Sequence, residues 1–177
     1  MQMPPVLVLT HRVFHACFFE PFAVELQGGY AEPVYFPSID SKPAIIGYRQ
    51  DYVRSALHEI AHWCVAGEQR RKLEDYGYWY EPDGRTAVQQ TEFFRAEVKP
   101  QALEYAFCLA LEISFEVSCD NLGSLDFDAQ AEFHSQVLLQ LNKMLQEGFP
   151  PRAEIFLHGL IQTNDLHWLE EKIKGLV

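Results

Sequence analysis

The chain has 177 residues and a formal net charge of -11, with 48% hydrophobic and 22% charged residues. This length suits one domain with a core of its own, and the composition is that of an ordinary globular protein. The acidic balance argues against nucleic acid as a direct partner, because the chain would repel its phosphate groups. It would favour a cationic substrate or a basic partner surface, although negative charge also serves solubility on its own.

We expect neither a secretion signal nor a membrane span. Residues 1–5 carry no basic group, the apolar stretch 6–9 is short, and no stretch approaches about 18 consecutive apolar residues. The four cysteines form no CxxC pair, which is typical of free thiols in a reducing compartment. The sequence therefore predicts a cytoplasmic protein without a membrane partner.

The N-terminal part is predicted to hold a helix, two short strands and a second helix. Residues 8–20 have a helical pattern, and proline and turn residues bound short strands at 33–37 and 44–48. The next helical pattern covers residues 51–67 and ends at Gly67, a residue type favoured just beyond a helix end. The apolar stripe of the first helix would consist of Phe14, Cys17, Phe18 and Phe22.

The remainder of the chain is predicted to be mainly helical. A charged helical piece at 68–75 is followed by a loop at 76–88 that is rich in glycine, proline and aromatic residues. A long helical pattern covers roughly residues 87–111, in which Pro100 is expected to cause a break or kink. Further helical patterns cover about 126–147, 150–162 and 164–175. The sequence therefore predicts an α+β fold, a single and mostly helical domain with a small sheet near the N-terminus.

The segment His58-Glu59-Ile60-Ala61-His62 is an HExxH motif inside the predicted helix 51–67. Positions i and i+4 of a helix share one face, so both imidazoles could bind one ion. Glu59 lies about 100° around the helix, where it could contact a water on that ion. The spacing suits zinc proteases, and it suits any divalent ion that accepts imidazole.

A catalytic ion needs a third protein ligand. The metzincin pattern would place a histidine six residues after His62, but Glu68 occupies that position. A carboxylate from the next long helix is the alternative, and Glu97 is the candidate. Glu92 and Glu104 share that helix, and spacing alone leaves them open.

Two imidazoles and one carboxylate serve two kinds of chemistry. Zinc hydrolases and non-haem iron(II) oxygenases both use this set and leave positions open for water, dioxygen or substrate. With zinc, Glu59 would be the general base; with iron, it would support the ligands or hold a cationic substrate.

Four blocks of the sequence resemble the bacterial elongation factor P hydroxylase family, in the family's order. The blocks are His58–Cys64 with Ala66-Gly67, Gly77–Tyr80 with Pro82–Arg85, Glu97–Leu103, and Val117–Leu122. The resemblance implies an enzyme that hydroxylates a lysine of elongation factor P after that lysine has received a β-lysyl group. It also implies a metal bound by His58, His62 and Glu97. The β-lysylated lysine is long and doubly cationic near neutral pH, in keeping with the acidic chain.

The resulting hypothesis is a single metal-dependent hydroxylase-like domain over residues 1–177. It would be a monomeric monooxygenase that uses Fe(II) and dioxygen, with β-lysylated elongation factor P as its partner and no direct contact to nucleic acid. A requirement for 2-oxoglutarate stays open, as do the native metal, the electron source, the lysine carbon attacked and the role of Glu59. Arg54, Arg85 and Arg95 could anchor the carboxylate of a co-substrate.

Two rival functions remain. One is a small zinc metalloprotease of the HExxH…E type, and the other is a non-catalytic adaptor that binds elongation factor P and uses the metal as a structural clip.

A second set of residues is predicted to bind the substrate. The aromatic side chains at 76–80 could hold a lysine-like cation by cation–π contact, or could simply anchor the loop in the core. Asp83 and Arg85 could pair across a turn, and Asp120 could cap a helix or shape a turn. The predicted substrate-binding residues are Tyr78, Trp79, Tyr80, Asp83, Arg85 and Asp120.

Overall fold

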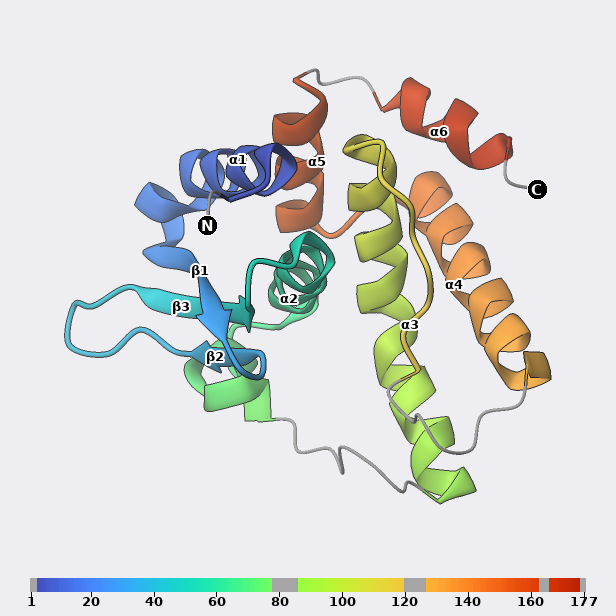
Figure 1. Cartoon of the computed structure of the whole chain (residues 1–177), viewed down its shortest axis with the longest axis horizontal. Helices are drawn as coiled ribbons and strands as arrows, with labels where there is room; N and C mark the ends of the chain where they lie inside the picture. Colours follow the sequence, from blue (N-terminus) through green and yellow to red (C-terminus); the bar gives the residue numbers. More distant parts are fainter. Residues whose placement is uncertain (1–2, 78–85, 120–126, 163–165, 176–177) are drawn as a thin grey trace.

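The computed structural model describes residues 3–77, 86–119, 127–162 and 166–175. Figure 1 shows the arrangement of their helices and strands. The helices are α1 (Pro5–Phe22), α2 (Val53–Val65), α3 (Ala87–Ala110), α4 (Phe127–Glu147), α5 (Pro151–Ile161) and α6 (His167–Lys174). The strands are β1 (Val24–Tyr30), β2 (Val34–Phe36) and β3 (Ala44–Arg49). The prediction of a mostly helical α+β fold with a small sheet near the N-terminus is confirmed. No helix among these is both long and apolar enough to cross a membrane.

The sheet has the strand order β1-β3-β2, with β3 parallel to β1 and antiparallel to β2. Strand β1 was not predicted, and it contains Gly28 and Gly29, a residue type that usually weakens a strand. The structure explains Gly28. A Cβ at this position would lie 2.6 Å from the Tyr48 hydroxyl, so only glycine lets β1 approach the neighbouring strand so closely.

The helix that carries the HExxH motif lies in the centre of the molecule, between the sheet and α3 (Figure 1). It is slightly shorter than predicted, because Ala66 is already extended (φ -62°, ψ 123°) and the chain leaves the helix there. Gly67 stands just beyond this C-cap residue, as predicted, although its backbone is not left-handed. The charged piece that follows consists of two short 3₁₀ turns, Arg70–Lys72 and Glu74–Gly77.

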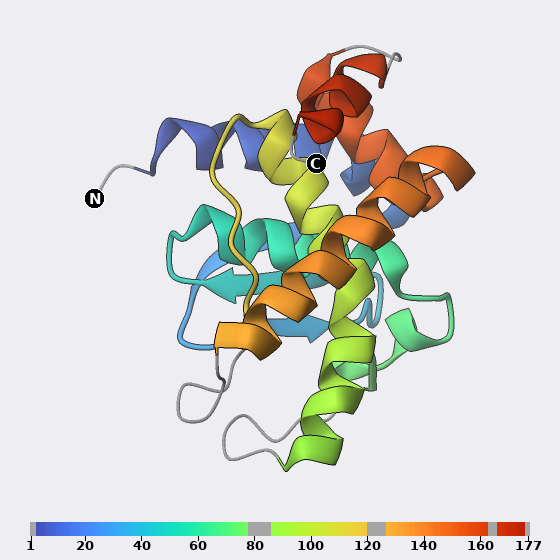
Figure 2. The same ribbon diagram turned by 90° about the vertical axis from the view of Figure 1, so that its right-hand side faces the viewer.

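Helix α3 continues through Pro100, so of the break or kink expected at this proline, the break does not occur. A proline removes one backbone hydrogen bond, but packing on both sides of a helix can outweigh that loss. Helix α3 has such support, because it packs between α2 and α4 (Figures 1 and 2).

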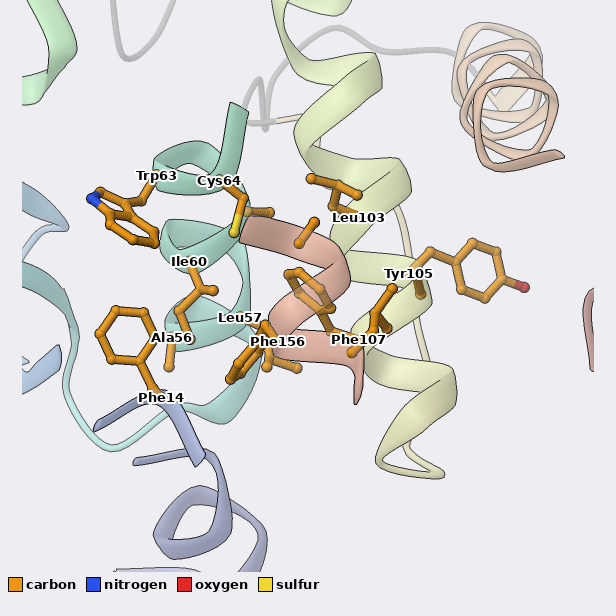
Figure 3. Packing of buried hydrophobic residues seen from close by; sticks show 14 of the residues in the cluster. Phe14, Ala56, Leu57, Ile60, Trp63, Cys64, Leu103, Tyr105, Phe107 and Phe156 are labelled. Atoms are coloured by element: carbon orange, nitrogen blue, oxygen red, sulfur yellow. The ribbon is translucent and has the colours of Figure 1, made fainter. Parts of the chain in front are cut away.

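The apolar core lies where α1, α2, α3 and α5 meet (Figure 3). The ring centroids of Phe18 and Trp63 are 4.9 Å apart, and those of Phe107 and Phe156 are 5.0 Å apart. The predicted stripe of α1 is only partly buried: Phe14 and Phe18 are fully buried, whereas Phe22 is 39% exposed and Cys17 is half-buried. All four cysteines carry thiols rather than disulfides, as predicted.

The C-terminal end of α2 is fixed by Arg152 of helix α5. The Arg152 guanidinium lies over the Trp63 ring and donates hydrogen bonds to the carbonyls of Trp63, Cys64 and Ala66. Arg71 donates to the Ala66 carbonyl as well. Carbonyls at the end of a helix lack partners within it and carry partial negative charge, so two cations stabilise this end. The arrangement holds α2 in place next to α3.

Candidate metal centre

His58, His62 and Glu97 come together in the space between α2 and α3. The two Nε2 atoms of the histidines are 3.0 Å apart, as expected for imidazoles one turn apart on the same face. Glu97 projects from α3 between them, with Oε2 at 3.4 Å from His58 Nε2 and Oε1 at 3.2 Å from His62 Nε2. One ligand atom from each residue lies within 4.8 Å of the others.

These separations suit one divalent ion. Ligands at about 2.1 Å from an ion lie about 3.0 Å apart for a right angle at the ion and about 3.4 Å apart for a tetrahedral angle. The distances in the structure fall in that range, with a different oxygen of Glu97 nearest to each histidine. Two imidazole nitrogens and one carboxylate oxygen are also a donor set that iron(II) and zinc accept. The residues therefore fit a metal ion and would leave further positions on it open.

Glu104 does not lie with Glu97 between the histidines, although the sequence allowed either residue as the third ligand. Its Oε2 accepts a hydrogen bond from His58 Nδ1 at 2.9 Å, on the far side of the imidazole from the other ligands. Its Oε1 accepts from Arg54, with Nη2 at 2.9 Å and Nε at 3.1 Å. A carboxylate behind a histidine in this way fixes the proton on Nδ1 and leaves Nε2 free for a metal. Glu92, the third alternative, is exposed.

Gln101 is a residue of this site that the sequence analysis missed. Its Nε2 atom donates to Glu97 Oε2 at 3.3 Å and to the Ser118 carbonyl at 2.7 Å. The signal was present in the spacing, because Glu97, Gln101 and Glu104 are one and two turns apart on α3. All three are almost fully buried, with 3%, 0% and 2% of their surface exposed. Buried polar side chains at this spacing on one helix indicate a shared polar site.

The charged groups at this site shift one another's pKa values. Burial alone would lower the pKa of His58, but the hydrogen bond to Glu104 and the charges of Glu97 and Glu104 outweigh it and raise the pKa to about 10. Burial would raise the pKa of Glu97, but His62 and His58 lower it to about 2. Without a metal, the cluster therefore contains a protonated His58 and an ionised Glu97. A metal ion would take the place of the His58 proton.

A pocket of about 370 Å³ opens beside His58. Its lining includes four glutamates and two arginines, so negative charge outweighs positive charge and favours a cation; these residues are Glu32, Glu59, Glu104, Glu116, Arg49 and Arg54. Burial raises the pKa of the Glu59 carboxyl, and the neighbouring histidines counteract this only in part. Glu59 thus lies beside His58 in the lining of the pocket, and its contact with a water on the ion stays a prediction.

The other predicted residues have different outcomes. The substrate-binding predictions for Tyr78, Trp79, Tyr80, Asp83, Arg85 and Asp120 fall outside the described residues. Tyr76 is buried and stacks on Tyr35 with ring centroids 4.2 Å apart, so it belongs to the core rather than to the wall of the pocket. Arg54 is bound to Glu104, and Arg95 is exposed.

The chain is similar to known proteins over most of its length. The sequence profile of the family described as elongation factor P hydroxylase matches residues 13–172. An elongation factor P lysine hydroxylase of Haemophilus influenzae is 44% identical over 150 residues, which cover 84% of this chain and 84% of that protein. The resemblance found in the four sequence blocks is thereby confirmed, and this chain belongs to the elongation factor P hydroxylase family.

Proposed function

We propose that this protein hydroxylates the β-lysyl-modified lysine of elongation factor P at a metal site formed by His58, His62 and Glu97. The observation that carries the proposal is the convergence of these three ligand atoms beside a pocket with acidic walls. The membership of the family supports the substrate, and the net charge of -11 agrees with a cationic one. The same charge disfavours direct contact with nucleic acid.

The proposed metal ion is Fe(II), which when bound would supply the oxygen chemistry with dioxygen as co-substrate. His58, His62 and Glu97 would hold it, and Glu104 would keep His58 oriented with Nε2 toward the ion. One oxygen atom of dioxygen would enter a lysine C–H bond, while the other would leave as water after taking two electrons from a reductant and two protons from the solvent. The protein itself would position the lysine side chain and exclude water.

The proposed role of the pocket is to bind the ammonium groups of the modified lysine. Glu32 and Glu116 are exposed on its wall and could meet the chain as it enters. Glu59 lies next to the ligands, where burial makes an unpaired negative charge unfavourable. A substrate ammonium would compensate that charge, so we assign Glu59 to substrate binding. The contributions of Tyr78, Trp79, Tyr80, Asp83, Arg85 and Asp120 remain proposals of the same kind.

The direct test is mass spectrometry of β-lysylated elongation factor P after incubation with the iron-loaded protein, air and a chemical reductant. We expect the modified lysine to gain the mass of one oxygen atom. His62→Ala should give no gain, and the exposed-site variant Glu92→Gln should behave as wild type. Absence of the gain under every reductant tried, including 2-oxoglutarate with ascorbate, would contradict the proposal.

The same ligand set also suits a zinc hydrolase, and this is the second candidate. A zinc-loaded hydrolase would cleave peptides under nitrogen and would lose turnover in Glu59→Gln, whereas an oxygenase stops without dioxygen. A non-catalytic adaptor would bind elongation factor P and change no bond in it. Its metal would act as a clip, so His58→Ala would then lower the melting temperature without affecting any product.

A further inference from the structure

The segment that follows α3 has a structural role that its sequence does not reveal. Residues 112–119, here called the return segment, form neither helix nor strand and run back along α3 (Figures 1 and 2). Glu116, Val117 and Ser118 of this segment line the pocket beside His58. The return segment therefore lies next to both the metal ligands and the proposed path of the substrate.

Two of the three metal ligands are connected to the backbone of the return segment through polar side chains, of which Glu104 and Gln101 are buried. His58 Nδ1 donates to Glu104, Glu104 accepts from Arg54, and Arg54 Nη2 donates to the Glu116 carbonyl. On the other side, Gln101 links Glu97 to the return segment. Its Nε2 donates to the Ser118 carbonyl at 2.7 Å, and its Oε1 accepts from the Ser118 amide at 3.0 Å.

Both connections are well supported by their surroundings. The Arg54 guanidinium lies 5.3 Å from the centre of the Phe115 ring, and Phe115 stacks on Tyr105 of α3 with ring centroids 4.3 Å apart. The planar guanidinium can bind a carboxylate and a carbonyl at once, which a lysine ammonium does less specifically. The Gln101 side-chain amide donates to the Ser118 carbonyl through Nε2 and accepts from the Ser118 amide through Oε1, so its orientation is fixed.

We propose that Glu104 and Gln101 are positioning residues, and that the return segment is the common anchor that holds His58 and Glu97 in the geometry a metal ion needs. The proposal rests on the proposed metal site, but not on the identity of the substrate. Partners behind metal ligands typically change metal affinity by about 10- to 100-fold when they are removed. Here Glu104, through Arg54, and Gln101 are both hydrogen-bonded to the return segment. A displacement of this segment would therefore displace the metal ligands, and the reverse.

The test is the binding of cobalt(II), without substrate, to wild type and to Glu104→Gln. The variant keeps the size of the side chain but offers one acceptor oxygen to two donors, His58 and Arg54. We expect about 10- to 100-fold weaker binding and a changed visible absorption spectrum of the bound cobalt, because the orientation of His58 changes. Glu92→Gln is the matched control, since it removes an exposed carboxylate from the same helix and should leave affinity and spectrum as in wild type.

A merely structural role of Glu104 gives a different result. The melting temperature of the metal-free protein would then fall, while the affinity and the cobalt spectrum of the folded fraction stay as in wild type, and this would overturn the proposal. Should Glu104→Gln fail to fold, Arg54→Lys serves instead, because Arg54 is partly exposed. We expect about three- to tenfold weaker cobalt binding in Arg54→Lys, and unchanged binding would equally overturn the proposal.

The second connection is tested by hydrogen exchange in the return segment. In wild type, cobalt should slow exchange of the Ser118 amide, because that amide donates to Gln101 and Gln101 donates to a metal ligand. In Gln101→Met the same amide should exchange faster and no longer respond to the metal. An equal response to cobalt in both proteins would contradict the coupling. Neither measurement involves elongation factor P. Hydroxylation can therefore fail while this proposal stands, and this proposal can fail while hydroxylation is observed.

Discussion

The two sides of helix α2 differ in almost every physical respect. On one side, Leu57 and Ile60 are fully buried among apolar side chains of the core (Figure 3). On the other side, His58 and His62 face the carboxylates of Glu97 and Glu104 on α3. Apolar burial contributes to folding whether or not a metal is present, whereas buried charges are a weak source of stability. The comparison suggests that one side holds the fold together and that the other side is arranged for binding a metal.

The largest effect should come from the charged side. Glu97→Gln keeps the shape of the side chain but removes the anionic ligand between the two histidines. We expect metal content near zero and complete loss of hydroxylation, while the metal-free protein still melts cooperatively because the apolar side is intact. Metal analysis and a thermal melt on the same sample check this. Wild-type metal content in the variant would mean that Glu97 is not a ligand.

The matching change on the apolar side is Leu57→Ala. The side chain is fully buried, so the free energy of unfolding should fall by about 2–5 kcal/mol through lost burial and a cavity. The folded fraction should still bind one metal ion with nearly wild-type affinity. Denaturant unfolding and metal titration at low temperature separate the two quantities. A strong loss of metal affinity in the folded fraction would show that the two sides are not independent.

Arg152→Met sharpens the comparison at the end of the same helix. It would remove this donor from two carbonyls of α2 and from that of Ala66 just beyond it, and we expect the free energy of unfolding to fall by about 1–3 kcal/mol. Lys143→Met is the control, because it breaks an exposed pair with Glu147 that contributes little. If the two variants are equally stable in denaturant unfolding, the proposed capping of α2 by Arg152 is wrong.

The charged side also predicts opposite pH dependences for metal binding and for folding. His58 has a pKa raised to about 10 in the metal-free protein, so binding requires release of its proton. Metal affinity should therefore rise by up to about tenfold per pH unit between pH 7 and 9, equivalent to about 1.4 kcal/mol. Calorimetric titrations in buffers with different ionisation enthalpies should show release of about one proton per ion.

The stability of the metal-free protein should change in the other direction over the same range. A folded pKa above the ordinary value stabilises the fold fully below about pH 6.5, and this contribution is lost as the pH rises toward 10. The lowered pKa of Glu97 adds stability above about pH 4.5 that is lost as the pH falls toward 2. A metal affinity that does not change between pH 7 and 9 would contradict the protonated His58.

The sequence predicted the elements whose pattern is local. The HExxH helix, α3 and the two short strands lie close to their predicted bounds, because periodicity and turn residues mark them directly. Strand β1 was missed, since the reason for Gly28 is the approach of Tyr48, which lies 20 residues away in the chain. The continuous helix at Pro100 was also missed, because packing by α2 and α4 cannot be read from the residues around the proline.

In the site, too, residues with a local sequence pattern were predicted, and contacts between distant residues were not. His58 and His62 could be paired from spacing alone, and Glu97 was favoured over Glu104 only through the family resemblance. Their different places depend on how α3 lies against α2, which sets Glu97 between the histidines and Glu104 behind one of them. The links from Arg54 and Gln101 to the return segment are contacts between residues far apart in sequence, and no local pattern marks them.

The central claim is that the cluster of His58, His62 and Glu97 supports oxygenation of a lysine rather than hydrolysis. The most direct measurement uses dioxygen labelled with the heavy isotope of oxygen, ordinary water, iron-loaded protein and β-lysylated elongation factor P. Mass spectrometry of the modified lysine should show one heavy oxygen atom in the product, and none of this product with Glu97→Gln. Incorporation of unlabelled oxygen alone, or peptide cleavage without any incorporation, would contradict the claim.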